Sequence, residues 1–222
     1  MSANVSEFAV SAAFLLTARA ATRQGGAGRM LRGGGSQATG RAYPGSMSAS
    51  DAFDWIALET HIRDRMLDEV RTYRVQHPSA RIYGAAFHIF YGETGGVIYW
   101  PAFGIATDED LVEISAEPGF TPDDLRWSPA DWTAQVDPSG DDQAWAARAQ
   151  LAAIGDDEHW DAVYDRFLRA FPAAAKDARR MLIADGTVED TFIAIAMDLE
   201  WELIPLSLTP DQLREHFPEL SA

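Results

Sequence analysis

The chain has 222 residues, which is enough for one domain or two small ones. It contains no cysteine, so disulfide bonds, cysteine-ligated zinc, iron–sulfur clusters and a cysteine nucleophile are excluded. Its formal net charge of −16 disfavours nucleic acids and anionic membrane surfaces as partners, because both attract clusters of Lys and Arg.

The charge is unevenly distributed along the chain. Residues 1–46 contain five arginines and one acid, whereas residues 47–222 contain 13 basic and 33 acidic residues, a net −20. The first segment is rich in Gly, Ala and Ser, so we expect a disordered extension over 1–46 and a single globular domain over 47–222. Three origins of the extension stay open: an upstream extension before a natural start at Met47, an organelle transit peptide, or a secretory signal around the apolar run 8–16.

An amphipathic helix is expected over about residues 51–76. It would begin after an N-cap at Ser50 and stop before Pro78. Apolar side chains recur on one face at spacings of three or four, as in a helix that packs on a core: Trp55, Leu58, Ile62, Met66, Val70 and Tyr73.

A β-hairpin is expected next. Residues 81–91, RIYGAAFHIFY, are apolar on both alternating faces, which is typical of a central strand covered on both sides. The Gly-containing loop 92–96 then leads to a second strand at about 97–103. Pro101 has no N–H for a sheet ladder, so this strand would end near Pro101 or lie at an edge.

Several acidic residues occupy positions that helix capping explains. A hydroxyl residue is followed three positions later by an acid or amide at residues 107–110, 121–124, 128–131 and 209–212. In this arrangement the cap oxygen and the later side chain satisfy each other's backbone N–H groups. These acids are therefore not interpreted as metal ligands.

The second half of the domain is mainly helical in its sequence pattern. Helices are expected over about 142–153, over 156–171, from Pro172 to Gly186, and from Thr209, with a strand at about 191–201. Strands do not alternate with single helices, so a doubly wound parallel sheet is not expected. The predicted class is α+β, with a small antiparallel sheet, formed by the hairpin 81–103 and the strand 191–201, packed with several helices.

The stretch YGAAFHIFYGETGGVIYWPAFGIATDEDL (83–111) and the following LRWSPADW (125–132) resemble the bacterial domain of unknown function 4303 family. The resemblance covers about residues 50–205 and weakens at IPLSLTP, after residue 200. It implies the fold and a bacterial origin, and it carries over no catalytic residues. We expect the protein to be cytoplasmic. Families of this type include small accessory or immunity-type proteins, so the resemblance favours an immunity-like role.

His88 is the first candidate for chemistry, because it lies in the middle of an otherwise apolar strand. Asp198, Glu200 and Glu202 alternate on the last predicted strand, so their carboxylates would project to one side. If that strand pairs with residues 81–91, His88 and Asp198 could form a base and its orienting acid. The alternatives are a buried histidine with a structural partner and carboxylates that face water.

Aromatic side chains are the second set of candidates. Trp127 and Trp132 flank the SPAD sequence, Arg126 precedes them, and Trp100 lies in the second strand. Exposed aromatic residues can anchor a partner, whereas buried ones belong to the core. Arg126 would bind an acidic group of a partner or pair with a nearby aspartate.

Three functions remain after these exclusions, and the last of them is a structural accessory domain with no dedicated site. The first is a non-catalytic, acidic protein-binding domain with a basic protein as its partner, which the charge favours. The second is a hydrolase or metal-dependent enzyme that uses His88 with Asp198 or Glu200. No histidine motif for a metal is present, and no sequence motif for a cofactor, so neither is predicted.

Overall fold

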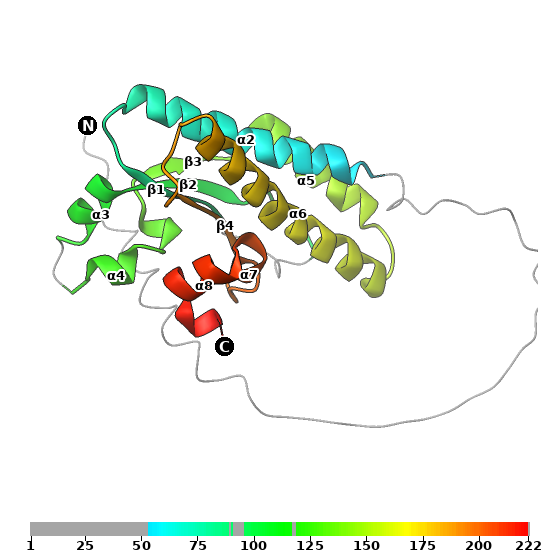
Figure 1. Cartoon of the computed structure of the whole chain (residues 1–222). Helices are drawn as coiled ribbons and strands as arrows, with labels where there is room; N and C mark the ends of the chain where they lie inside the picture. The colour runs from blue at the N-terminus through cyan, green and yellow to red at the C-terminus, as the bar shows by residue number, and fades with distance from the viewer. Residues whose placement is uncertain (1–52, 89, 91–95, 117–118, 222) are drawn as a thin grey trace, which may run out of the picture. The chain divides into compact units, whose positions relative to one another are not determined.

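The computed structural model describes residues 53–88, 90, 96–116 and 119–221. A four-stranded mixed sheet runs through this part of the chain, in the order β3–β2–β1–β4 (Figure 1). Its strands are β1 (Ile82–His88), β2 (Ala102–Thr107), β3 (Ala134–Val136) and β4 (Ile193–Met197). Helices cover this sheet, so the predicted α+β class is confirmed. The extension expected over 1–46 lies outside the described residues.

β1 is a central strand that is buried on both faces, as its sequence predicts. It pairs with β2 in antiparallel and with β4 in parallel orientation. Phe87 faces one core and Ala86 the other, and both are fully buried. The expected antiparallel pairing therefore holds for the hairpin, whereas β4 makes the sheet mixed.

The parallel pairing of β4 follows from the length of the helix before it. α6 (Asp157–Ala184) has 28 residues and, at 1.5 Å per residue, is about 42 Å long. Such a helix carries the chain back across the sheet, so β4 enters from the same end as β1. A parallel neighbour requires a crossover connection of this kind.

Helices α2 (Trp55–Gln76), α5 (Gly140–Ala152) and α6 cover one face of the sheet, and α2 and α6 lie side by side (Figure 1). α2 begins later than expected because its N-cap is Asp54, whose Oδ1 accepts a hydrogen bond from the Ala57 N–H at 2.9 Å. The predicted cap at Ser50 lies outside the described residues. The apolar stripe of α2 is buried as predicted except for Tyr73, which is partly exposed, and each fully buried large side chain contributes about 1.5–3 kcal/mol.

α6 is one continuous helix through Pro172, which corrects the expectation that a new helix begins there. A proline inside a helix lacks the N–H that would bond to the carbonyl four residues earlier, and this costs about 3 kcal/mol or more. Phe167, Phe171 and Pro172 are all buried, and so are Ala175 and Ala178 in the following turns. Packing of both halves against the core outweighs the cost of the proline.

Short elements cover the opposite face of the sheet. They are the 3-10 turn η2 (Pro129–Asp131) and the C-terminal elements α7 (Ile204–Ser207), α8 (Pro210–His216) and η3 (Pro218–Leu220). Their apolar side chains join the sheet in a second cluster: Ala86, Ala106, Trp132, Ile193, Ile195, Met197, Ile204, Leu208 and Phe217. α3 (Asp108–Ile114) and α4 (Pro122–Leu125) follow β2.

Two strands differ in length from the prediction. β2 begins at Ala102, so the run 97–101 precedes the strand rather than forming it. β4 ends at Met197, and Trp201 has a left-handed φ of 63°, which an extended strand cannot contain. The alternation expected up to residue 201 therefore does not exist after Met197.

The capping predictions are confirmed for Thr121 and Thr209, which form full capping boxes with the residue three positions later. Thr107 caps α3 through its side chain. Ser128 makes no side-chain cap, and its hydroxyl donates to Asp131 instead. A further capping box at Ser139 and Asp142 begins α5 and was not among the predicted caps.

Candidate functional site

Two hollows adjoin the turn 77–81 between α2 and β1. Arg74 holds this turn in place, because its guanidinium donates to the carbonyl of Ala80 at 2.6 Å and to that of Thr187 at 3.0 Å. α3 is tied to the same turn, since Glu109 Oε2 accepts from the Arg81 N–H at 3.0 Å. The turn therefore has a fixed position between α2, α3 and the loop before β4.

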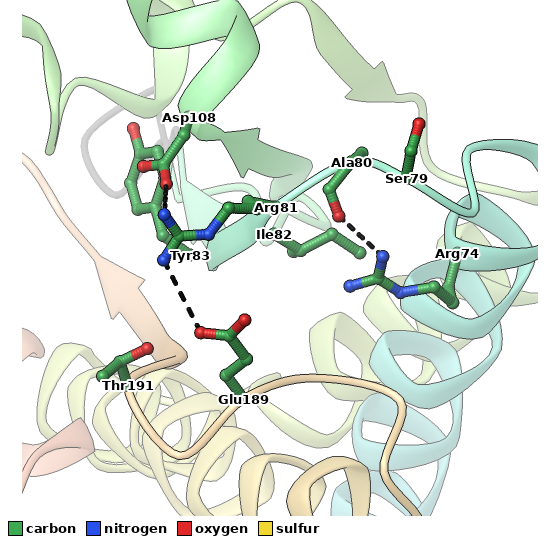
Figure 2. Close-up of a pocket in the computed structure, with 9 residues that line it drawn as sticks. All are labelled: Arg74, Ser79, Ala80, Arg81, Ile82, Tyr83, Asp108, Glu189 and Thr191. Carbon is green, nitrogen blue, oxygen red and sulfur yellow. Dashed lines mark hydrogen bonds and ion pairs between the residues drawn. The ribbon is translucent and has the colours of Figure 1, made fainter.

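The smaller hollow has a volume of about 180 Å³ and is lined by charged groups that already pair with one another (Figure 2). The Arg81 guanidinium lies 3.3 Å from Asp108 Oδ2 and 3.6 Å from Glu189 Oε2. Exposed pairs of this kind contribute about 0.2–1 kcal/mol each. Their charges compensate each other, so this hollow carries no unmatched charge that would select a ligand.

The larger hollow has a volume of about 580 Å³ and a different chemical character. Its lining includes Tyr73, His77, Thr107, Glu109, Asp110 and Thr133, and no Lys or Arg is among its described lining residues. The Oδ2 atom of Asp110 is buried and has no hydrogen-bond partner in the described part of the chain. The hollow therefore holds two carboxylates without a lining cation.

The pKa of Tyr73 is affected by the negative charges of this hollow. Burial raises the pKa of Tyr73 above its ordinary value of 10.0, the carboxylates of Asp110 and Glu109 raise it further, and a hydrogen bond with Thr107 opposes them. The Tyr73 ring is stacked on His77, with ring centroids 4.3 Å apart. An aromatic pair and two carboxylates together line one hollow, a combination that suits a cation.

Asp110 is available because its expected capping role is only half fulfilled. In α4, α5 and α8 the third helical residue accepts a hydrogen bond from the N-cap N–H. In α3 the Thr107 hydroxyl accepts from the Asp110 N–H at 3.1 Å, but the Asp110 carboxylate does not complete the box. This difference is not predictable from the sequence, since residues 107–110 have the same pattern as the complete capping boxes.

His88 has a structural partner. It is buried, and its Nε2 donates to Gln135 Oε1 at 2.9 Å. The Gln135 amide is fixed in turn, because its Nε2 donates to the carbonyls of Pro129 and Trp132. Burial lowers the pKa of His88 below 6.5, although the hydrogen bond to Gln135 opposes this. His88 is therefore a neutral, oriented histidine at neutral pH.

β4 pairs with β1 and places Met197, the residue before Asp198, opposite His88. Asp198 follows β4, and its Oδ1 accepts from the Leu203 N–H at 3.1 Å. Glu200 is exposed in the turn after Asp198. No hydrogen bond or ion pair among the described residues joins His88 to Asp198, Glu200 or Glu202. The geometry does not favour a general base with an orienting acid here.

The predicted aromatic binding residues divide into core and partly exposed side chains. Trp100 and Trp132 are buried in the two cores, and the Trp132 Nε1 atom has no hydrogen-bond partner among the described residues. Trp127 is partly exposed and contacts Tyr83 and His216 edge-on. Arg126 lies over the Tyr83 ring, 4.9 Å from its centroid. Arg126 and Trp127 therefore both contact Tyr83, and Trp127 packs at the margin of the second core cluster, which includes Trp132.

A buried charged network links α2 to α5. Asp142 is fully buried and accepts hydrogen bonds from His61, Arg65 and Ser139. Arg65 also pairs with Glu69. The network uses the carboxylate for capping and for helix packing, and no sequence motif predicts it because its members are 77 or more residues apart on α2 and α5.

In the described part of the chain, no group of three or more His, Asp or Glu side chains is arranged to hold a metal ion. None of the described helices combines the length and the apolar composition that a membrane crossing requires. Comparison with known protein families, with curated proteins and with solved structures found no match to this chain. The likeness to the domain of unknown function 4303 family therefore stays a prediction.

Proposed function

We propose that the chain is a non-catalytic binding domain whose acidic surface binds a basic protein. The observation that carries the proposal is that the arginines of the described chain are already paired within the protein. Every arginine among the described residues has a carboxylate, a backbone carbonyl or an aromatic ring as partner: Arg63, Arg65, Arg71, Arg74, Arg81, Arg126, Arg148, Arg166, Arg169, Arg179, Arg180 and Arg214. Most of the acids in the described part of the chain are exposed, so their excess of negative charge faces solvent.

The start of α6 illustrates this excess. Asp156, Asp157, Glu158 and Asp161 are exposed within six consecutive residues. Asp156 and the two acids that follow it also favour the positive end of the helix dipole. At a net charge of −16, the field of the whole chain attracts cationic partners and accelerates their association at low salt.

The proposal extends to a bacterial and immunity-like protein on the strength of the sequence resemblance alone, and we propose that it is cytoplasmic. A domain that neutralises a basic toxin or regulates a basic enzyme needs charge complementarity and no catalytic group of its own. The enzymatic alternative, a hydrolase or metal-dependent enzyme that uses His88 with Asp198 or Glu200, has no supporting hydrogen bond or ion pair between these residues in the described part of the chain. Nucleic acid and membrane binding do not fit a surface with this charge.

The test is affinity capture with the tagged full chain from its native lysate at about 50 mM and about 500 mM salt, read by mass spectrometry. The 50 mM condition leaves surface charges weakly screened, with a Debye length of more than 10 Å, and the 500 mM condition screens them. We expect one stoichiometric basic protein at low salt that is lost at high salt. The purified pair should then bind with a dissociation constant that rises with salt. A partner that is acidic, or binding that is independent of salt, contradicts the proposal.

A further inference from the structure

We propose that Arg126 binds the carboxylate of an acidic side chain of a partner protein, beside the rings of Tyr83, Trp127 and His216. The inference goes beyond the proposed function, because it concerns an anionic group and holds with or without a basic partner. The sequence leaves two roles open for Arg126, an ion pair with a nearby aspartate or a contact with an acidic group of a partner. The contacts of Arg126 in the folded chain favour the second role.

Arg126 has no carboxylate partner in the described part of the chain. Its guanidinium lies over the Tyr83 ring, 4.9 Å from the ring centroid, and no ion pair joins it to the flanking aspartates Asp123, Asp124 and Asp131. Asp124 and Asp131 instead accept hydrogen bonds from the hydroxyl groups three residues before them. The guanidinium donors of Arg126 therefore have no acceptor among the described residues, and an acceptor from a partner can use them.

Tyr83 fixes Arg126 in two ways. Its ring lies under the guanidinium, and its hydroxyl donates to the Arg126 carbonyl at 3.0 Å. Burial raises the pKa of Tyr83, so the phenol stays protonated and keeps this hydrogen bond at neutral pH. A guanidinium over an aromatic face still donates from its edge, in the fork that matches a carboxylate. Holding the fork in place before binding lowers the entropic cost of binding.

Trp127 and His216 extend the site beside Tyr83. The ring centroids of Tyr83 and Trp127 are 5.6 Å apart, and those of Trp127 and His216 are 5.4 Å apart. Both Trp127 and His216 are partly exposed, so a ligand reaches them from solvent. An acidic side chain has an apolar stem that can pack on the indole while its carboxylate pairs with the guanidinium.

The pKa of His216 shows an excess of positive charge at this site. Burial lowers the pKa of His216 below 6.5, the carboxylate of Glu215 opposes this, and the charges of Arg126 and Arg179 lower the pKa further. Arg179 donates to two backbone carbonyls, which carry no compensating charge. Two guanidinium groups thus act on His216 against one carboxylate, although the whole chain has a net charge of −16. A carboxylate bound at Arg126 raises the pKa of His216.

The experiment titrates the full chain with N-acetyl-glutamate-N′-methylamide and follows the His216 ring and the Trp127 amide by NMR. The matched probe is the glutamine derivative, which has the same shape and no charge. We expect the glutamate probe to raise the pKa of His216 and to shift the Trp127 amide saturably, and the glutamine probe to bind at least about 10-fold more weakly. Equal binding of both probes, or no saturable shift at these two residues, overturns the proposal. Inorganic phosphate is the third probe, and tighter binding of phosphate than of the glutamate probe overturns the assignment to a carboxylate.

Three variants localise the effect. Arg126→Gln removes the charge, so it should weaken binding of the glutamate probe by about 10-fold and raise the pKa of His216 in the absence of a probe. Arg126→Lys keeps the charge but removes the fork, so it should also weaken binding, and it serves if Arg126→Gln does not fold. Arg180→Gln, at an exposed position of α6, is the control and should bind as the unaltered chain does. Unchanged binding by a folded Arg126→Gln or Arg126→Lys chain overturns the proposal.

Discussion

The Nε2 atom of His61 lies 2.7 Å from Oδ1 of Asp142, a carboxylate that has no exposure to solvent. His61 lies on α2 and Asp142 on the first turn of α5, so one contact joins two helices far apart in sequence. Both oxygens of Asp142 are used, because Oδ2 accepts from Ser139 and from Arg65. A buried carboxylate satisfied in this way fixes how α5 sits against α2.

The first prediction concerns the stability of this junction. Asp142→Ala removes the capping acceptor of α5 and leaves His61 and Arg65 without their shared anion, so the free energy of unfolding should fall by about 2–4 kcal/mol. Urea unfolding measures the loss. Asp141→Ala, in the same helical turn but exposed, should change stability by less than about 0.5 kcal/mol. Equal effects of the two substitutions would contradict the role of Asp142.

The same carboxylate predicts a loss of stability in acid. Burial raises the pKa of Asp142, but hydrogen bonds from Ser139 and His61 and the charge of Arg65 outweigh burial and hold the pKa below 3.8. A depressed pKa in the folded state means that stability is present above 3.8 and is lost as the pH falls through the folded value. Unfolding free energies measured below pH 4 should therefore decrease less steeply for Asp142→Asn than for the unaltered chain. Parallel curves would show that Asp142 titrates normally.

His88 predicts a second pH window. Burial lowers its pKa below 6.5, so the unfolded chain takes up a proton at pH values where folded His88 stays neutral. Stability should therefore fall as the pH decreases below about 6.5, by up to about 1.4 kcal/mol per pH unit between the two pKa values. His88→Gln should remove this part of the slope. Burial also lowers the pKa of His216, so a smaller slope of the same sign should remain in the variant. The exposed His77→Gln variant serves as the control for a histidine outside the core.

The fold was predictable where local pattern and packing agree. The apolar stripe of α2 and the two-sided apolar pattern of β1 both identified buried elements. The prediction of a new helix at Pro172 was wrong. Proline favours the first turn of a helix, but the buried residues on both sides of Pro172 keep α6 continuous. The parallel orientation of β4 could not be predicted from the residues of the strand, because it depends on the end of the sheet at which the long helix α6 finishes.

The candidate site was less predictable, because residues that are far apart in the sequence come together only in the folded chain. His88 was identified as unusual from sequence, but its partner Gln135 lies 47 residues away across β2. Asp110 has the sequence position of a capping residue, and only the structure shows that its Oδ2 is unpaired. Trp100 and Trp132 were candidates for binding because composition does not distinguish a core tryptophan from an exposed one.

Gly104 makes the contact between His88 and Gln135 possible and supplies the last prediction. A Cβ added at Gly104 would lie 3.0 Å from Trp132 Cε3, a tight contact, and 3.4 Å from Gln135 Nε2, so Gly104→Ala pushes on Trp132 and touches the amide that holds His88. Overpacking of this kind costs about 1–3 kcal/mol, and urea unfolding together with the NMR signal of the His88 ring should show a loss of stability and a changed His88 environment. Gly140→Ala is the matched control, because its Cβ meets nothing within 4 Å and replacing glycine in a helix should stabilise the fold by about 0.4–1 kcal/mol. If Gly104→Ala is as stable as Gly140→Ala and leaves the His88 signal unchanged, the hydrogen bond between His88 and Gln135 does not depend on a glycine at position 104.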